Sequence, residues 1–414
     1  MIQLLNILSL ITMALNAEAF SIVIGVNPAL QKRFILSSKT PTLIPGDVHR
    51  ASQIQVGIGG KGQDVSVTLG CLSADKSYVF LAQFLGKGSA GDLALSKLKE
   101  ALHEVDDSNG SSSLEALTIR TVASLRTCTT IVAEDSATEL VEPSGKISPG
   151  EIQTLMDKID NVTFERRLRG LCIMGSMPPG CPQNLYGHIF AKIAIQHPQT
   201  ITVIDTVVGL EPLFQHMRTN NDITEGNRML KVNFAELCRL ANVRVKSETA
   251  EASQGQIKDA ITAFLATFTD ARPALDYIAI TNGCHPAHLA CIQCESKGKA
   301  IYDLFRLSMP SLSILQLDIQ SKTFPIGAGD SVTAGTLAAW ECLCINDCTE
   351  RLSSDVQNAL KQKLDSPCGN IAAVSFAFGI ACGSASCAQE ENSVLVVNDA
   401  LTLFGYVDIK KLSH

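Results

Sequence analysis

Short apolar runs of β-forming residues alternate with helix-like segments along most of this chain, and this alternation constrains the fold more than any other feature. The candidate strands are mostly apolar, as expected for strands buried on both faces of a sheet. Buried strands separated by helices are typical of a parallel sheet covered on both sides. The sequence therefore predicts an α/β fold, with strands near residues 21–26, 78–85, 170–174, 202–204, 230–232 and 277–280 and helices near residues 61–70, 90–102, 184–196, 234–241, 254–267 and 330–340.

Two segments, 34–58 and 119–140, follow a different pattern. They alternate polar and apolar residues without a helix-like stretch inside them, which is typical of a small antiparallel sheet with one face in water. We expect this sheet to stand off the main body as a lid. It would belong to one domain over residues 20–414, with polar insertions near residues 103–117 and 341–370.

The composition suits a large buried core and disfavours several kinds of partner. Of the 414 residues, 46% are hydrophobic and 18% are charged, unlike a disordered chain. The net charge of −7 and the single Trp argue against a nucleic-acid surface or an anionic membrane as partner. An anionic substrate would therefore need a local positive site.

Cysteine usage gives no sign of a metal or disulfide framework. The 14 cysteines mostly lie singly in apolar segments, where a free thiol behaves as a small hydrophobe. The densest group runs from Cys284 to Cys294 and includes two histidines. A zinc site is disfavoured there because Cys291 and Cys294 would point to opposite faces of a strand.

The first 19 residues differ from the rest of the chain. An apolar run at residues 4–15 precedes Ala17-Glu18-Ala19, a small-x-small cleavage pattern, and Phe20 after it resembles the boundary of plastid-targeting presequences. The run is too short for a stable membrane span and carries no basic residue. We expect a signal or targeting segment, with an unusual N-terminal extension as the alternative. The secretory route, a plastid and, without cleavage, the cytoplasm stay open as destinations.

The sharpest chemical motif is Gly327-Ala328-Gly329-Asp330, which precedes a helix-like run at residues 332–340. The glycines permit a tight turn, and the N-terminus of a helix presents free N–H groups to an anion such as phosphate. A carboxylate at that place can accept the proton of an attacking hydroxyl. The alternative is that Asp330 only caps the helix.

Two further motifs have structural alternatives. Gly59-Gly60-Lys61 also precedes a helix and offers a second anion-facing turn, although it lacks the spacing of a Walker A loop. Asn233 and Glu236 stand three residues apart, a spacing that would equally suit an ordinary capping box.

Six motifs occur in an order that resembles the PfkB carbohydrate kinase family. They are Asn27-Pro28-Ala29, Gly59-Gly60-Lys61-Gly62, Phe84-Leu85-Gly86, Gly175-Ser176-Met177-Pro178-Pro179-Gly180, Lys231-Val232-Asn233-Phe234-Ala235-Glu236 and Gly327-Ala328-Gly329-Asp330-Ser331. Within that family the chain most resembles 1-phosphofructokinase and tagatose-6-phosphate kinase. The resemblance implies a ribokinase-like three-layer α/β/α sandwich with a mainly parallel sheet and a small β lid.

The same resemblance implies a role for each matching residue. Asp330 would be the general base of an ATP-dependent kinase, with Gly327, Ala328 and Gly329 as an anion hole. Asn233 and Glu236 would organise Mg²⁺ through water, and Thr281 and Gly283 would join Asn233, Gly327 and Gly329 around ATP. A sugar or sugar phosphate would be bound by Asn27, Gln31, Gly59, Gly60, Lys61, Asp64 and Arg126. Lid strands of related folds often pair between subunits, which implies a homodimer.

Three positions on the acceptor side depart from the family pattern. Gln31 stands where relatives usually have Asp, Asp64 stands where they have Asn, and Cys128 aligns with an Arg of phosphosugar kinases. Arg126 could replace that Arg, since residues two apart in a strand share a face. A kinase of a free sugar or nucleoside therefore stays open, as does a catalytically silent relative with a structural or regulatory role.

Overall fold

The computed structural model describes residues 19–36, 42–73, 78–102, 113–133, 137–219, 227–244, 251–268, 274–294, 300–316, 323–344 and 351–412. Residues 1–18 of the expected targeting segment (1–19) and residues 103–112 of the first insertion lie outside these ranges, whereas Ala19, the last residue of that segment, begins the first strand of the fold. No helix in the described part has the length and apolar character needed to cross a membrane.

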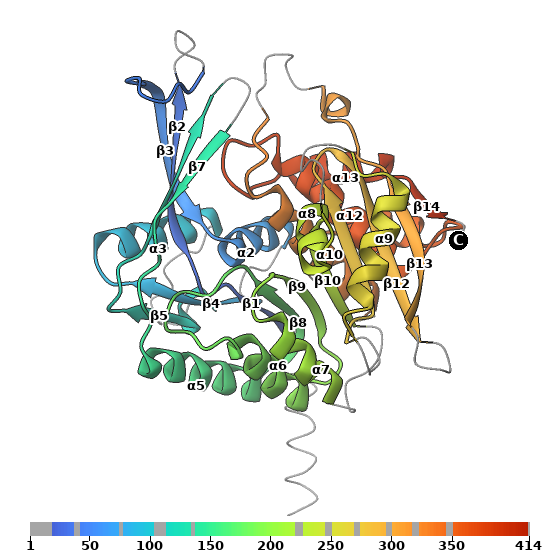
Figure 1. The fold of residues 1–414 in the computed structure, drawn as a ribbon, viewed down its shortest axis with the longest axis horizontal. Coiled ribbons are helices and arrows are strands. Elements are labelled where there is room, and N and C mark those ends of the chain that lie inside the picture. The colour runs from blue at the N-terminus through green and yellow to red at the C-terminus, as the bar shows by residue number, and fades with distance from the viewer. Residues whose placement is uncertain are drawn as a thin grey trace, which may run out of the picture.

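A ten-stranded sheet runs through the centre of the molecule in the order β14-β13-β12-β11-β10-β9-β8-β1-β4-β5 (Figure 1). The strands from β11 to β5 in this order are parallel, as the apolar runs predicted, and β12, β13 and β14 add to one side as antiparallel strands. The bounds are β1 (Ala19–Ile24), β4 (Val79–Gly86), β5 (Thr118–Thr121), β8 (Arg167–Met174), β9 (Ile201–Asp205), β10 (Arg228–Asn233), β11 (Tyr277–Asn282), β12 (His285–Cys294), β13 (Ala300–Leu307) and β14 (Ile409–Leu412).

Helices cover both faces of this sheet, because its buried strands present apolar side chains alternately to either side. In β1, Ile22 and Ile24 join one apolar core and Val23 joins the other. One face carries α2 (Lys61–Leu72), α3 (Ser89–Leu102), α4 (Ser113–Ala116), α10 (Ala328–Cys344), α11 (Ser354–Leu364), α12 (Ile371–Ser386) and α13 (Val397–Tyr406). The other face carries α5 (Pro149–Glu165), α6 (Leu185–Gln196), α7 (Leu210–Thr219), α8 (Phe234–Leu240) and α9 (Gln254–Leu265). The predicted three layers are confirmed.

A second, four-stranded sheet stands off the main body at the upper left of Figure 1, in the order β3-β2-β6-β7. Its strands are β2 (Ala29–Leu36), β3 (Ala51–Gly59), β6 (Thr127–Val132) and β7 (Ala137–Val141). We refer to it as the small sheet.

The expectation of a purely antiparallel small sheet was wrong, because β2 and β6 pair in parallel. The cause lies in the main sheet. Strands β1 and β5 are both parallel members of it, so their carboxyl ends lie at the same edge and the chain leaves the body in the same direction after each. Residues 119–121, expected in the lid, belong to β5 of the main sheet. The second insertion contains a regular helix, α11.

Candidate active site

A cavity opens where the strand order of the main sheet reverses. After β1 the chain adds β4 on one side, whereas β8 lies on the other. Ligands of open α/β sheets bind outside the carboxyl ends of the strands at such a point. A cavity of about 230 Å³ lies there, and its lining includes Asn27, Lys61, Arg126, Ser176 and Glu236.

Two of the predicted acceptor residues form part of the cavity wall and are held by the protein itself. The side-chain amide of Asn27 donates to Ser176 Oγ at 2.9 Å, and Asn27 Oδ1 accepts from Ser144 Oγ at 2.8 Å. The guanidinium of Arg126 donates to the backbone carbonyls of Asn27 and Pro28, at 3.0 and 3.3 Å. Arg126 therefore braces the start of β2 in this conformation.

The electrostatic centre of the site is Asp205, at the carboxyl end of β9. Its carboxylate is 1% exposed and accepts from Lys61 Nζ at 2.6 Å, Lys231 Nζ at 2.7 Å and Thr333 Oγ1 at 2.9 Å. Burial alone would raise the pKa of Asp205, but Lys231 and Lys61 hold it below its usual range. Burial likewise would lower the pKa of Lys61, but Asp205, Asp330 and Glu236 together raise it above its usual range.

Asp330 lies in the first turn of α10, half-buried and within the electrostatic reach of this group. Burial and the nearby carboxylates of Asp205 and Glu236 raise the pKa of Asp330 to about 7, although Lys61 and Lys231 oppose the shift. Titration near neutral pH suits a group that must take up a proton from a substrate.

The turn before α10 is fixed by contacts at Gly327. Gly327 has a φ of 82°, and a Cβ there would lie 2.4 Å from Ser393 Oγ, so only glycine fits. Its carbonyl accepts from Ser393 Oγ at 3.0 Å and from the N–H groups of Asp330 and Ser331 at 3.0 and 2.9 Å. The N–H of Ala328 donates to Pro325 O at 3.2 Å. The glycine turn at residues 327–330 is therefore held by intramolecular hydrogen bonds, and one of them, at 3.2 Å, already uses the N–H of Ala328.

Glycines also allow α2 to begin close to β1. Gly60, with a φ of 114°, caps α2 without a side-chain hydrogen bond. A Cβ on Gly62 would lie 2.3 Å from the Cα of Gly25. This close approach brings Lys61 over the end of β1 and toward Asp205. Gly59 ends β3, where a Cβ would lie 2.9 Å from Gln31 Oε1.

Asn233 and Glu236 form the capping box that their spacing suggested as an alternative role. Asn233 Oδ1 accepts from Glu236 N at 2.8 Å, and Glu236 Oε2 accepts from Asn233 N at 2.9 Å. The other carboxylate oxygen, Glu236 Oε1, lies 3.8 Å from Lys61 Nζ. Thr281 of β11 pairs with Asn233 of β10, and Gly283 follows with a φ of 58° and open space at its Cβ position.

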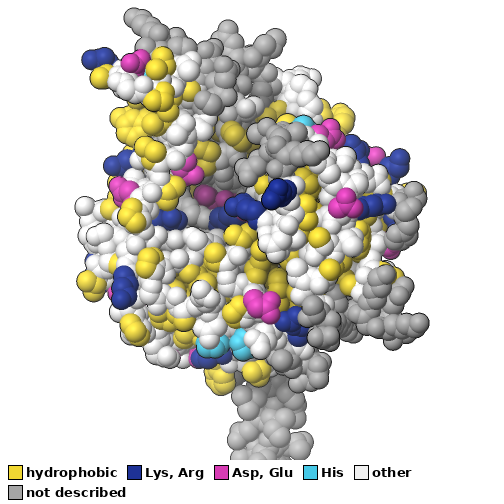
Figure 2. Space-filling view, in the orientation of Figure 1, with side chains coloured by type: hydrophobic (Ala, Val, Ile, Leu, Met, Phe, Trp, Pro, Cys, Tyr) yellow, Lys and Arg dark blue, Asp and Glu magenta, His cyan; other side chains and the backbone are white. Residues whose placement is uncertain are grey.

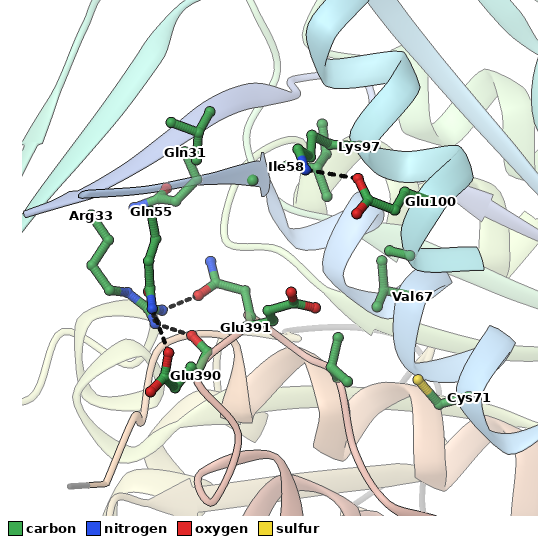
Figure 3. Close-up of a pocket in the computed structure, with 15 residues that line it drawn as sticks. Gln31, Arg33, Gln55, Ile58, Val67, Cys71, Lys97, Glu100, Glu390 and Glu391 are labelled. Atoms are coloured by element: carbon green, nitrogen blue, oxygen red, sulfur yellow. Dashed lines mark hydrogen bonds and ion pairs between the residues drawn. The ribbon is translucent and has the colours of Figure 1, made fainter. Parts of the chain in front are cut away.

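Two of the three substituted acceptor positions, Gln31 and Asp64, lie beneath the small sheet rather than on the wall of the 230 Å³ cavity. Gln31 donates to Thr130 Oγ1 at 2.7 Å and lines a larger cavity of about 540 Å³ between the small sheet, α2, α3 and residues 390–394 (Figure 3). Asp64 is 5% exposed, and its Oδ1 has no hydrogen-bond partner among the described residues. Burial raises its pKa well above the usual range, Asp330 adds to the shift, and Arg33 opposes it.

Figure 2 shows basic and acidic side chains gathered in the hollow below the small sheet. The structure brings Asn27, Lys61, Arg126 and Glu236 to one cavity, with Asp330 electrostatically coupled to Lys61 and Glu236. Sequence reasoning missed Asp205, Lys231 and Thr333. A signal existed for two of them, because an acidic residue ends the apolar strand β9 and a lysine interrupts the buried strand β10.

Comparison with known proteins identifies the fold. No family model matches the sequence. Phosphofructokinase-2 from Escherichia coli, in complex with potassium, superimposes with a TM-score of 0.61 at 16% identity, covering 94% of this chain and 99% of that one. A possible 1-phosphofructokinase from Thermotoga maritima gives 0.61 at 14% identity, covering 96% and 100%. Ribokinase from Giardia lamblia gives 0.62 at 14% identity, covering 92% and 99%. The chain therefore has the ribokinase-like α/β fold that its ordered motifs predicted.

Proposed function

We propose that the protein is an ATP-dependent kinase that phosphorylates a hydroxyl of a sugar or sugar phosphate, with Asp330 as general base. The observation that carries this proposal is the position of Asp330. It stands on the glycine turn at the start of α10, within electrostatic reach of the Lys61–Asp205–Lys231 group at the switch point of the sheet. Solved structures with this fold include phosphofructokinases and a ribokinase.

In the proposed reaction, Asp330 accepts the proton of the attacking hydroxyl. As that proton leaves, the hydroxyl oxygen bonds to the terminal phosphorus of ATP and the bond to the diphosphate leaving group breaks. The pKa of about 7 leaves a large fraction of Asp330 ionised at neutral pH and ready to act. Gly327, Ala328 and Gly329 would direct N–H groups and the helix dipole toward the transferred phosphoryl group.

The donor side would be built from the ends of β10 and β11 and the turn before α10. Thr281 and Gly283 lie beside Asn233, and the open space at Gly283 fits a nucleotide that approaches the backbone closely. Asn233 and Glu236 would hold Mg²⁺ through water, and the outward Glu236 Oε1 is a suitable oxygen donor. When bound, the ion would neutralise charge on the phosphates.

The acceptor would lie between the cavity at Asn27 and the inner face of the small sheet. There Gly59, Gly60, Lys61 and Arg126 would surround it, with Gln31 and Asp64 under the sheet. Closure of the small sheet over this space would exclude water and limit wasteful ATP hydrolysis.

A second candidate function is phosphorylation of an uncharged sugar or nucleoside. The observation that favours it is that both side chains expected to bind a substrate phosphate already have partners within the protein. Lys61 is bonded to Asp205, and Arg126 is bonded to two backbone carbonyls. A substrate phosphate would have to compete with these partners or displace them.

The test is turnover of Mg-ATP by the full chain with fructose 1-phosphate, fructose 6-phosphate, tagatose 6-phosphate, ribose, fructose and nucleosides. We expect slow ATP hydrolysis alone and acceptor-dependent ADP formation with at least one member. A sugar phosphate as the best acceptor would support a phosphosugar kinase. An uncharged sugar or a nucleoside as the best acceptor would support the second candidate function. Absence of acceptor-dependent turnover across the whole panel would contradict the kinase proposal and favour a non-catalytic role.

A further inference from the structure

Arg33 reaches from the small sheet to a loop that follows α12 (Figure 3). It projects from β2, is 3% exposed, and its guanidinium donates to the backbone carbonyl of Glu390 and to Asn392 Oδ1. Gln55 of the neighbouring strand β3 adds a parallel contact, because its amide donates to Glu390 Oε2 at 2.7 Å. Strands β2 and β3 of the small sheet therefore both form hydrogen bonds with the same loop, which lies more than 300 residues away in sequence.

The last residue of this loop, Ser393, contacts the glycine turn at residues 327–330. Ser393, fully buried and with a φ of 56°, donates through Oγ to the carbonyl of Gly327 at 3.0 Å. The carbonyl of Ser393 in turn accepts from Thr68 Oγ1 of α2 at 2.6 Å, and Thr68 Oγ1 lies 2.9 Å from Ser331 Oγ of α10. The orientation of Ser393 is thus tied to both helices that border the site.

A second route leads from Arg33 to the same turn. The guanidinium lies 5.4 Å from the ring centroid of Phe324, in a cation–π arrangement. Phe324 stands three residues before Gly327, and its N–H donates to Cys387 O at 2.8 Å. Arg33 therefore contacts both segments that adjoin Gly327, namely the loop at residues 390–392 and Phe324.

We propose that Arg33 is a positioning residue for the turn at residues 327–330, which adopts its working geometry only while the small sheet is seated against the loop at residues 390–393. This rests on the proposed kinase function. If the small sheet lifted away, Arg33 would lose its hydrogen bonds to Glu390 and Asn392 and its contact with the Phe324 ring, so both segments that adjoin Gly327 would lose a support. Seating of the small sheet and ordering of the glycine turn are therefore coupled.

The test compares Arg33→Gln, Ser393→Ala and the double variant with Lys32→Gln as matched control. Lys32 directly precedes Arg33 in β2, so its side chain points to the opposite face of the sheet. Lys32→Gln removes the same charge but leaves the contacts with the loop in place. With Mg-ATP and the best acceptor of the panel, Arg33→Gln should lower kcat about tenfold, a typical coupling between contacting groups, while both KM values stay within about threefold. The double variant should lose little more than the more damaging single change.

Hydrogen exchange of peptides covering residues 323–331, measured without substrates, gives a readout independent of activity. We expect faster exchange in Arg33→Gln and Ser393→Ala and no change in Lys32→Gln. Unchanged exchange in Arg33→Gln, or additive losses of kcat in the double variant, would overturn the proposal. If Arg33→Gln fails to fold, Ser393→Ala, which removes one hydroxyl, decides by the same exchange measurement. If the wild type phosphorylates no acceptor, the kinase proposal fails while exchange still decides the role of Arg33.

Discussion

Asp205 organises the charges of the site, and its neighbours explain why Asp330 titrates where it does. Two ammonium groups share the one buried carboxylate of Asp205, so each lysine is held in place by an ion pair with it. The like charge of Asp205 raises the pKa of Asp330, and the opposite charges of Lys61 and Lys231 lower it. The like charge and burial prevail, which leaves Asp330 a stronger base than an ordinary aspartate.

Asp330→Asn should abolish most phosphoryl transfer while preserving nucleotide binding. An amide keeps the shape of the side chain but cannot accept the proton, so kcat should fall by roughly 10²- to 10⁴-fold. Calorimetric titration with Mg-ATP should give a dissociation constant close to that of the wild type. A variant that turns over at a near-normal rate would exclude Asp330 as the base.

The same substitution should stabilise the folded protein at alkaline pH. Because folding raises the pKa of Asp330 from about 4 to about 7, the folded state favours the protonated form. The ionised carboxylate lowers the free energy of unfolding. This decrease is absent below the pKa of the unfolded state, grows as the pH rises toward 7, and reaches its full size above pH 7. Asp330→Asn should therefore melt roughly 2 to 4 °C higher at pH 8 and gain little at pH 4. A gain that is equal at both pH values would contradict the shift.

The candidate site divides into residues that a linear motif can reveal and residues that it cannot. Asp330, Lys61 and the glycine turns are adjacent in sequence to helix starts, so their roles could be proposed from local chemistry. Asp205 and Lys231 act through an ion pair between separate strands, and their partnership depends on which strands become neighbours. The tie between Arg33 and residues 390–392 is hidden for the same reason.

The helix α2 is placed by glycine rather than by a side-chain cap. Its first turn crosses β1 so closely that neither Gly62 nor Gly25 has room for a methyl group. Since Lys61 extends from this turn, the height of α2 over the strand determines whether its ammonium reaches Asp205. The helix and its lysine are thus positioned together.

Gly62→Ala should push α2 away from β1 and weaken the site, whereas Gly57→Ala should be harmless. The added methyl group would meet the backbone of Gly25, and overpacking of this kind costs about 1–3 kcal/mol. At Gly57 a Cβ meets nothing within 4 Å. Chemical denaturation of both variants should show a loss of stability in the first alone, and acceptor-dependent turnover should fall with it. Equal stability of the two variants would refute the close contact.

Elements formed by continuous apolar runs were predictable, because burial on both faces of a sheet demands such runs. The predicted strands and helices near β1, β8, α2 and α10 were confirmed, with ends that differ by a few residues. The parallel pairing of β2 with β6 was not predictable from alternation alone, since alternation tells which residues share a face but not which strand lies next.

The small sheet has two different faces. Its inner face carries Gln31, Arg33 and Thr130, which are buried. Register places Ile54 beside Phe34 on the outer face, and Leu140 is on the same side; Ile54 and Leu140 are 58% and 57% exposed. An apolar outer face on a projecting sheet suits contact with a second copy of the chain.

If the small sheet pairs with a second copy through this face, as we propose, Leu140→Lys should shift the protein from dimer to monomer, because a charge within an apolar contact is costly to bury. Light scattering after size-exclusion chromatography at micromolar concentration would measure this. Ile195→Lys on α6 is the control, since Ile195 is 74% exposed and lies outside the small sheet. A wild type that is monomeric, or a control that dissociates equally, would contradict dimerisation through this face.

The central place of β1 affects how the chain can fold during its synthesis. One neighbour, β4, emerges from the ribosome soon after it, but the other, β8, begins only at Arg167, and Ser21 of β1 finally bonds Glu341. At typical rates of synthesis this apolar strand waits many seconds with one edge unpaired. We expect chaperone binding to be strongest on nascent chains that end before Met174 and to fall once β8 is available to close that edge.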